Sequence, residues 1–125
     1  MILDTNALSA LAEKDTSLLN RLQEARRLAV TVVSLGEYKY GIARSRARAE
    51  LEAWLTAFLR RAEVLYPDLD TVSHYATVRN ELREAGTPIP ANDCWIAALV
   101  RQHGVPIVSR DHHFDHVNRL RRIEW

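Results

Sequence analysis

The sequence predicts a three-layer α/β/α fold with a mainly parallel sheet of four to five strands flanked by helices. Short, continuous apolar runs alternate along the chain with longer segments of helical periodicity. Strands that alternate with helices favour a parallel sheet that is covered on both faces. The 125 residues, of which 47% are hydrophobic and 26% charged, have the length and composition of one folded domain. We therefore expect a single domain over residues 1–125.

The first part of the chain supplies two strands and two helices. Residues 2–3 form a short apolar run, and apolar residues then recur at helical spacing over residues 7–11. A second helix is expected over residues 17–27, where leucines share one face. The β-branched run at residues 28–33 predicts a buried strand.

The middle of the chain predicts two further helices and a third strand. Ser34 is a good N-cap, and Glu37 follows it at the spacing of a capping box, which predicts a helix through Ile42. A longer helix is expected from about Ala47, because apolar residues recur there as a stripe. The short run at residues 64–66 predicts the third strand, which the following proline stops.

Two helices and the remaining strands complete the predicted fold. Asp70 is positioned to cap a helix that runs toward Gly86, a typical C-terminal stop. After a rigid, proline-containing loop, Asn92 is expected to cap another helix, which Gly104 closes. Residues 105–109 predict a fourth strand, and the last residues of the chain a short fifth.

Four acidic residues fall where such a sheet has its ligand crevice. Asp4 lies at the carboxyl end of the first strand and Asp111 just beyond the fourth. Glu37 and Asp93 occupy the first turns of helices that are entered from loops, so they reach the same edge if those helices begin there. Each of these acids taken alone also has a structural explanation, as a first-turn acid, a capping-box member or part of an Asx turn. Asp4 fits such an explanation worst, because an acid directly after a buried strand needs a partner.

Carboxylates that meet at one edge repel one another unless a cation lies between them. Oxygen ligands indicate Mg²⁺, with Mn²⁺ as an alternative, rather than zinc. The sequence therefore predicts a divalent-metal site at this edge of the sheet. Four polar residues flank the acids and are expected to hydrogen-bond carboxylates or metal-bound water: Thr5, Asn6, Asn92 and Ser109.

Four short motifs carry this chemistry in chain order: Leu3-Asp4-Thr5-Asn6, Ser34-Leu35-Gly36-Glu37 with Gly41, Asn92-Asp93 with Ile96-Ala97-Ala98, and Ser109-Arg110-Asp111 with Phe114. In their order and distances they resemble the motifs of the PIN-domain nucleases. In length and layout the chain is most similar to the VapC-like toxins of prokaryotic toxin-antitoxin pairs. The resemblance covers essentially the whole chain, and all four acids are kept.

The resemblance implies a metal-dependent endoribonuclease that hydrolyses phosphodiester bonds in RNA. It further implies a homodimer that is inhibited by a small partner antitoxin. On this basis Asp4, Asp93 and Asp111 are expected to be metal ligands. Glu37 is expected either to bind the metal through water or to assist in activating the nucleophile.

Composition excludes several other classes of protein. The formal net charge of +1 argues against a nonspecific polyelectrolyte binder. No apolar stretch is long enough to span a bilayer, and the first residues lack the basic and apolar regions of a secretory signal. The single cysteine, Cys94, agrees with a reducing compartment. We therefore expect a cytoplasmic protein with no membrane partner.

Three histidines around Asp115 resemble a transition-metal cluster: His112, His113 and His116. Adjacent histidines in a loop or a short helix cannot all converge on one ion, so a surface loop is expected instead. In such a loop, His112 or His113 could touch a substrate phosphate.

Two other functions remain compatible with acids at a sheet edge. A receiver-like or phosphatase domain would need a lysine near its acceptor aspartate, and no lysine follows Lys39. A noncatalytic module that holds RNA or a partner protein on the same fold is the stronger alternative. If the protein is such a module, it should still bind its RNA or protein partner after metal is removed.

Overall fold

A computed structural model describes all 125 residues and contains one parallel sheet of five strands in the order β3-β2-β1-β4-β5. The strands are β1 Ile2–Leu3, β2 Ala29–Thr31, β3 Glu63–Leu65, β4 Ile107–Val108 and β5 Arg122–Ile123. The first strand lies at the centre, because Ile2 pairs in register with Ala29 on one side and with Ile107 on the other. The carboxyl ends of β1, β2 and β4 therefore meet at one edge of the sheet.

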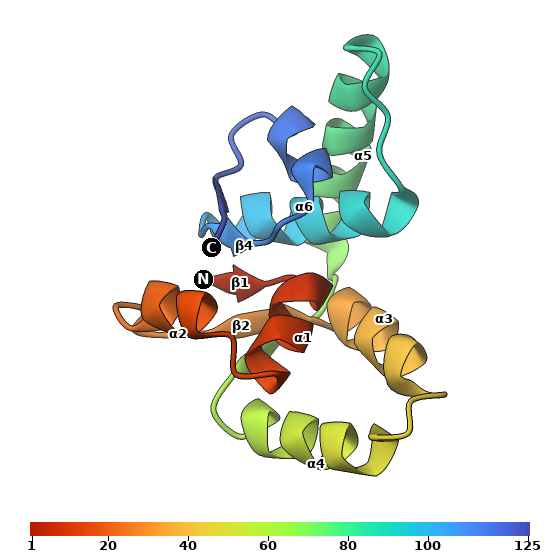
Figure 1. Ribbon diagram of the computed structural model, residues 1–125. Coiled ribbons are helices and arrows are strands. Elements are labelled where there is room, and N and C mark those ends of the chain that lie inside the picture. Colours follow the sequence, from red (N-terminus) through yellow and green to blue (C-terminus); the bar gives the residue numbers. More distant parts are fainter.

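Helices cover both faces of this sheet (Figure 1). One face carries α1 Thr5–Ala12, α2 Thr16–Leu22, α3 Val32–Ile42 and α4 Arg48–Leu59. The other carries α5 Leu69–Glu84, α6 Ala91–His103 and the 3₁₀ helix η1 His112–His116. This arrangement confirms the predicted three-layer α/β/α class. None of the helices has both the length and the apolar composition needed to cross a bilayer.

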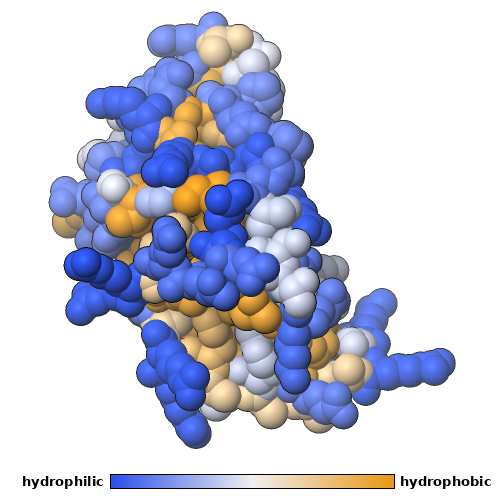
Figure 2. Space-filling model, turned by 60° about the vertical axis from the view of Figure 1, so that its left-hand side comes forward, coloured by the Kyte–Doolittle hydropathy of each residue, from blue (hydrophilic) through white to orange (hydrophobic).

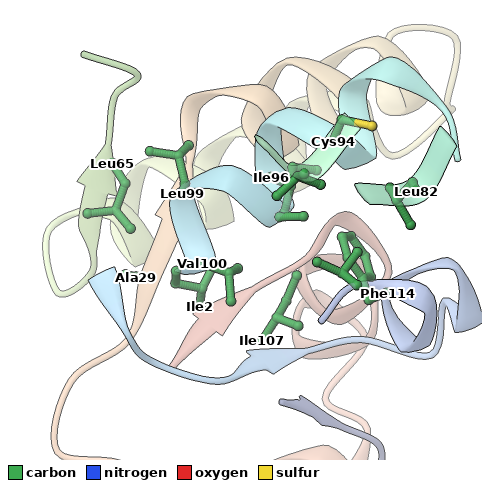
Figure 3. Packing of buried hydrophobic residues seen from close by; sticks show 13 residues of the cluster. Ile2, Ala29, Leu65, Leu82, Cys94, Ile96, Leu99, Val100, Ile107 and Phe114 are labelled. Carbon is green, nitrogen blue, oxygen red and sulfur yellow. The ribbon is translucent and has the colours of Figure 1, made fainter. Parts of the chain in front are cut away.

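The central strands divide the hydrophobic core into two clusters, since successive side chains of a strand point to opposite faces. Ile2 and Ile107 belong to the cluster beneath α5, α6 and η1, which Figure 3 shows. Their neighbours Leu3 and Val108 belong to the cluster beneath α1 to α4. On the surface, the face of the molecule in Figure 2 is mostly hydrophilic, with smaller apolar patches between the polar side chains.

The capping box predicted at Ser34 is wrong, because the N-cap of α3 lies three residues earlier. Thr31 ends β2 in an extended conformation and is itself the N-cap, with its hydroxyl accepting a hydrogen bond from the Ser34 N–H at 3.0 Å. The predicted strand over residues 28–33 is correspondingly too long. Glu37 therefore lies in the second turn of α3, where its carboxylate is free for contacts with other elements.

Two further caps differ from the predictions. The N-cap of α5 is Asp68 rather than Asp70, because Asp68 forms a reciprocal capping box with Thr71. The N-cap of α6 is Pro90 rather than Asn92, and no side chain caps this helix. Asn92 instead lies inside the first turn of α6. Its side chain is therefore available to hydrogen-bond a residue of another helix.

Candidate metal centre

Asp4 lies at the carboxyl end of β1, where the chain turns into α1. The residue is only 4% exposed, and its Oδ2 accepts hydrogen bonds from Ser109 Oγ at 2.8 Å and from Asn6 Nδ2 at 3.2 Å. Burial raises the pKa of the Asp4 carboxyl to about 6, and the nearby charges of Asp93 and Glu37 add to this rise, while the hydrogen bonds oppose it. The surroundings of Asp4 therefore disfavour its ionised form.

Ser109 and Asn6 join the loop after β4 to the end of β1. Ser109 Oγ accepts from the Asp111 N–H at 2.9 Å while donating to Asp4. Asn6 Nδ2 also donates to Ser109 Oγ at 3.2 Å, and Asn6 Oδ1 accepts from the Arg110 N–H at 3.1 Å. The positions of Asp4 and Asp111 are therefore fixed relative to each other by uncharged groups.

Glu37 reaches the same edge of the sheet from α3. Its Oε2 accepts a hydrogen bond from Thr5 Oγ1 at 2.9 Å, and its Oε1 accepts from Asn92 Nδ2 at 3.1 Å. Thr5 belongs to α1 and Asn92 to α6, so helices from both faces of the sheet hold this one carboxylate. Each oxygen has one neutral donor and retains further capacity to accept a proton or bind a cation.

Asp93, Asp111 and His113 form the tightest group at this edge. One potential ligand atom from each lies within 4.8 Å of those of the other two. His113 Nδ1 is 2.9 Å from Asp93 Oδ2 and 3.2 Å from Asp111 Oδ1. The backbone N–H of His113 also donates to Asp111 Oδ1 at 2.9 Å, because Asp111 caps η1.

The charges of this group shift the pKa values of its members. Burial is the main cause of the raised pKa of Asp93, and the negative charges of Asp111 and Glu37 raise it further, while the contact with His113 lowers it. The hydrogen bond to Asp93 raises the pKa of His113. Asp4 and Glu37 lie outside this group of three. The charge of Glu37 raises the pKa of Asp93, and the charge of Asp93 raises the pKa of Asp4.

The structure thus brings all four predicted acids into one electrostatically coupled cluster. Together with His113 they form a donor set of carboxylate oxygens and one imidazole nitrogen, which carries an excess of negative charge. Two of the carboxyl groups, those of Asp4 and Asp93, have raised pKa values. Such a set fits a divalent cation, which would offset the repulsion between the carboxylates. The side chains that the sequence places next to the acids supply neutral hydrogen bonds, which orient the carboxylates without neutralising them.

Arg122 holds η1, which carries part of this site, against the end of the sheet. Its side chain is 10% exposed, and it donates to both carboxylate oxygens of Asp115, at 2.7 and 2.9 Å, and to the Ser109 carbonyl at 2.9 Å. These hydrogen bonds lower the pKa of Asp115 to about 2. His112 Nδ1 also lies 2.9 Å from Asp115. The histidines therefore separate, with His112 at Asp115 and His113 at Asp93, rather than converging on one point.

The sequence alone does not single out His113, which it places in a surface loop. The ring is half exposed, but it lies between Asp93 and Asp111 rather than pointing freely into solvent. The sequence does contain one signal for the contact between Asp111 and His113. An aspartate that caps a turn accepts a hydrogen bond from the backbone N–H two residues later, which keeps that residue close to the carboxylate. The contact between Asp111 and His113 follows this pattern, whereas the contact with Asp93 depends on the tertiary fold.

Replacing Asp4 by asparagine is expected to stabilise the metal-free protein at pH 7, because it removes a buried charge and keeps the volume. Above pH 6 the folded protein carries the full penalty for the ionised carboxyl, which we expect to amount to about 1–3 kcal/mol. As the pH falls through 6 toward 4, folded Asp4 takes up a proton and the penalty disappears. Thermal melts in EDTA should therefore show a higher Tm for Asp4→Asn at pH 7 and little difference at pH 4. An equal gain at both values would contradict this explanation.

Comparisons with known proteins agree with the fold. The model of the PIN domain family matches residues 1–120. Ribonuclease VapC2 of Haemophilus influenzae and the tRNA(fMet)-specific endonuclease VapC of Shigella flexneri are each 29% identical, over 99% of this chain and 96% of theirs. The crystal structure of DNA-bound VapBC from Salmonella typhimurium superimposes with a TM-score of 0.87 at 28% identity, covering 99% of this chain and 96% of that one. The chain therefore belongs to the PIN domain family, in which these VapC ribonucleases are its relatives.

Proposed function

We propose that this protein is a metal-dependent endoribonuclease that hydrolyses phosphodiester bonds in RNA and acts as the toxin of a toxin-antitoxin pair. The observation that carries the proposal is the meeting of four carboxylates from four separate segments at one edge of the sheet. Relatives that match nearly the whole chain are named ribonucleases and endonucleases. The cluster of carboxylates and the names of the relatives therefore both support hydrolysis of RNA.

The proposal assigns Asp4, Asp93 and Asp111 as the residues that hold Mg²⁺, with Mn²⁺ as an alternative. When bound, such a cation would favour deprotonation of a water nucleophile and offset charge that develops on the phosphate. The oxygens of Glu37 are oriented by Thr5 and Asn92, so this carboxylate is placed to accept a proton or to hold a water molecule. Asn6 and Ser109 both donate to Asp4 Oδ2, which orients this carboxylate and leaves its Oδ1 available for a cation.

We also propose two partners for this chain, an antitoxin protein and a second copy of the chain. The solved relative from Salmonella typhimurium is a VapBC complex, and the VapBC-5 structure from Mycobacterium tuberculosis is described as a member of the VapBC family of toxin-antitoxin systems. We infer by analogy that this chain has a cognate antitoxin and that it works as a homodimer. An RNA substrate and an antitoxin would both be met in the cytoplasm, which is where the proposal places the protein.

The experiment that tests the function is RNA cleavage by the purified chain with and without metal. Total tRNA and ribosomal RNA are incubated with the protein in Mg²⁺, in Mn²⁺ and in excess EDTA. Cleavage is expected only with a divalent cation and should return when the EDTA sample receives excess Mg²⁺. Equal cleavage in EDTA would remove metal from the mechanism. RNA binding without cleavage under every condition would favour the noncatalytic module on the same fold.

A further inference from the structure

His113 occupies a position that the four-carboxylate site does not explain. Its Nδ1 lies between two carboxylates of that site, 2.9 Å from Asp93 Oδ2 and 3.2 Å from Asp111 Oδ1. Both acids are assigned as metal ligands in the proposed function. One potential ligand atom from each of Asp93, Asp111 and His113 thus lies within 4.8 Å of those of the other two.

The distances between these atoms are those of neighbouring ligands on one ion. With bonds of about 2.1 Å in an octahedral shell, adjacent ligand atoms lie roughly 3 Å apart. The two separations at His113 Nδ1 fall close to this value. In the tautomer that carries its proton on Nε2, the imidazole presents an Nδ1 lone pair toward the same point.

The position of His113 is built into the fold. Its backbone N–H is fixed by Asp111 Oδ1 at 2.9 Å. The next residue, Phe114, is fully buried in the hydrophobic cluster under α6 and anchors η1 (Figure 3). Arg122 holds the other side of η1 through Asp115. Three attachments thus direct the His113 ring at Asp93, although the ring itself is half exposed.

The other histidines of η1 do not share this position. His112 Nδ1 is engaged with Asp115 at 2.9 Å and lies next to Arg122, whose positive charge opposes a cation. His116 is exposed on the same 3₁₀ helix. His116 is therefore a matched control for the loss of an imidazole from η1.

We infer that His113 is a metal ligand through Nδ1, beside Asp93 and Asp111, and that it shifts the preference of the site from Mg²⁺ toward Mn²⁺. Imidazole nitrogen binds Mn²⁺ and later transition ions better than it binds Mg²⁺, which prefers oxygen and water. Coordination replaces the hydrogen bond from Nδ1 to Asp93, and the displaced proton moves to Nε2 or leaves to solvent. The inference rests on the proposed function in one respect, namely that a divalent ion occupies the acidic site.

Pulsed electron paramagnetic resonance of bound Mn²⁺ tests this ligand directly, because a coordinated imidazole nitrogen modulates the electron spin echo. The wild-type protein and His116→Ala are expected to show the ¹⁴N coupling, and His113→Ala to lack it. Titration calorimetry should show Mn²⁺ binding weakened about tenfold in His113→Ala and Mg²⁺ binding weakened by less than about threefold. Neither readout depends on RNA cleavage.

The outcomes separate this inference from the proposed function. Bound Mn²⁺ without ¹⁴N coupling in the wild type would overturn the role of His113 and leave the carboxylate site standing. Coupling that survives in His113→Ala would assign the nitrogen to another residue and also overturn the inference. If the wild type binds neither Mn²⁺ nor Mg²⁺, the metal-dependent function is overturned together with it.

Discussion

Replacing Asp93 by asparagine is expected to slow RNA cleavage at least about a hundredfold. The change removes one ligand charge from the proposed metal site, where the cation supplies several kcal/mol of charge stabilisation. It also weakens the contact that holds His113 Nδ1 at 2.9 Å. The amide keeps almost the same volume, so the first turn of α6 should remain folded. Single-turnover cleavage at saturating Mg²⁺ measures the loss.

Asp70 offers a matched control for Asp93. Both are acids in the first turn of a helix, but Asp70 lies exposed at the start of α5 and makes no contact with the site. Asp70→Asn should therefore cleave RNA at the wild-type rate. Equal loss of activity in both variants would indicate a general effect of removing a first-turn charge. Near-full activity in Asp93→Asn would exclude Asp93 from the catalytic site.

Replacing Phe114 by alanine is expected to destabilise the protein by about 3–5 kcal/mol. Phe114 is fully buried and is the largest fully buried side chain of the protein. It packs into the cluster that contains Ile2 and Ile107 from the central strands. Because stabilities of single domains are about 5–15 kcal/mol, this one change should remove a large share of the total.

Urea unfolding of Phe114→Ala and of a control, Leu69→Ala, measures this loss. Leu69 is 87% exposed, so its truncation should change the free energy of unfolding by less than about 0.5 kcal/mol. Since η1 carries His113 and follows Asp111, the Phe114 variant should also bind divalent metal more weakly while it is still folded. A loss of stability below about 1 kcal/mol would show that the cluster closes around the missing ring.

The elements of the fold could be predicted because the strands are short apolar runs separated by helical segments. Ile2, Leu3 and Val108 are buried on both sides of the sheet, so their segments contain no polar alternation that would suggest an exposed strand. The helix starts were harder. Thr31 and Ser34 are both competent N-caps, and the choice between them depends on where β2 stops pairing with its neighbours.

The candidate site, too, could be predicted only in part from the sequence. Acids that follow strands or begin helices can be located from one segment at a time, which is why Asp4 and Asp111 could be predicted to share an edge. The partner of each acid depends on other segments. Asn92 lies 55 residues from Glu37, and His113 lies 20 residues from Asp93. These contacts follow from the packing of α3, α6 and η1, which no local pattern contains.

The central position of β1 affects how the protein is made. Asp4 meets Ser109 across 105 residues of sequence, and β1 gains its second neighbour only when β4 pairs with it. Contacts of such high sequence separation form late, because the intervening chain must first be ordered. During synthesis Asp4 is made almost at once but remains without its partner until the ribosome has passed residue 109. A nascent chain would therefore lack a complete acidic site until most of its residues have emerged.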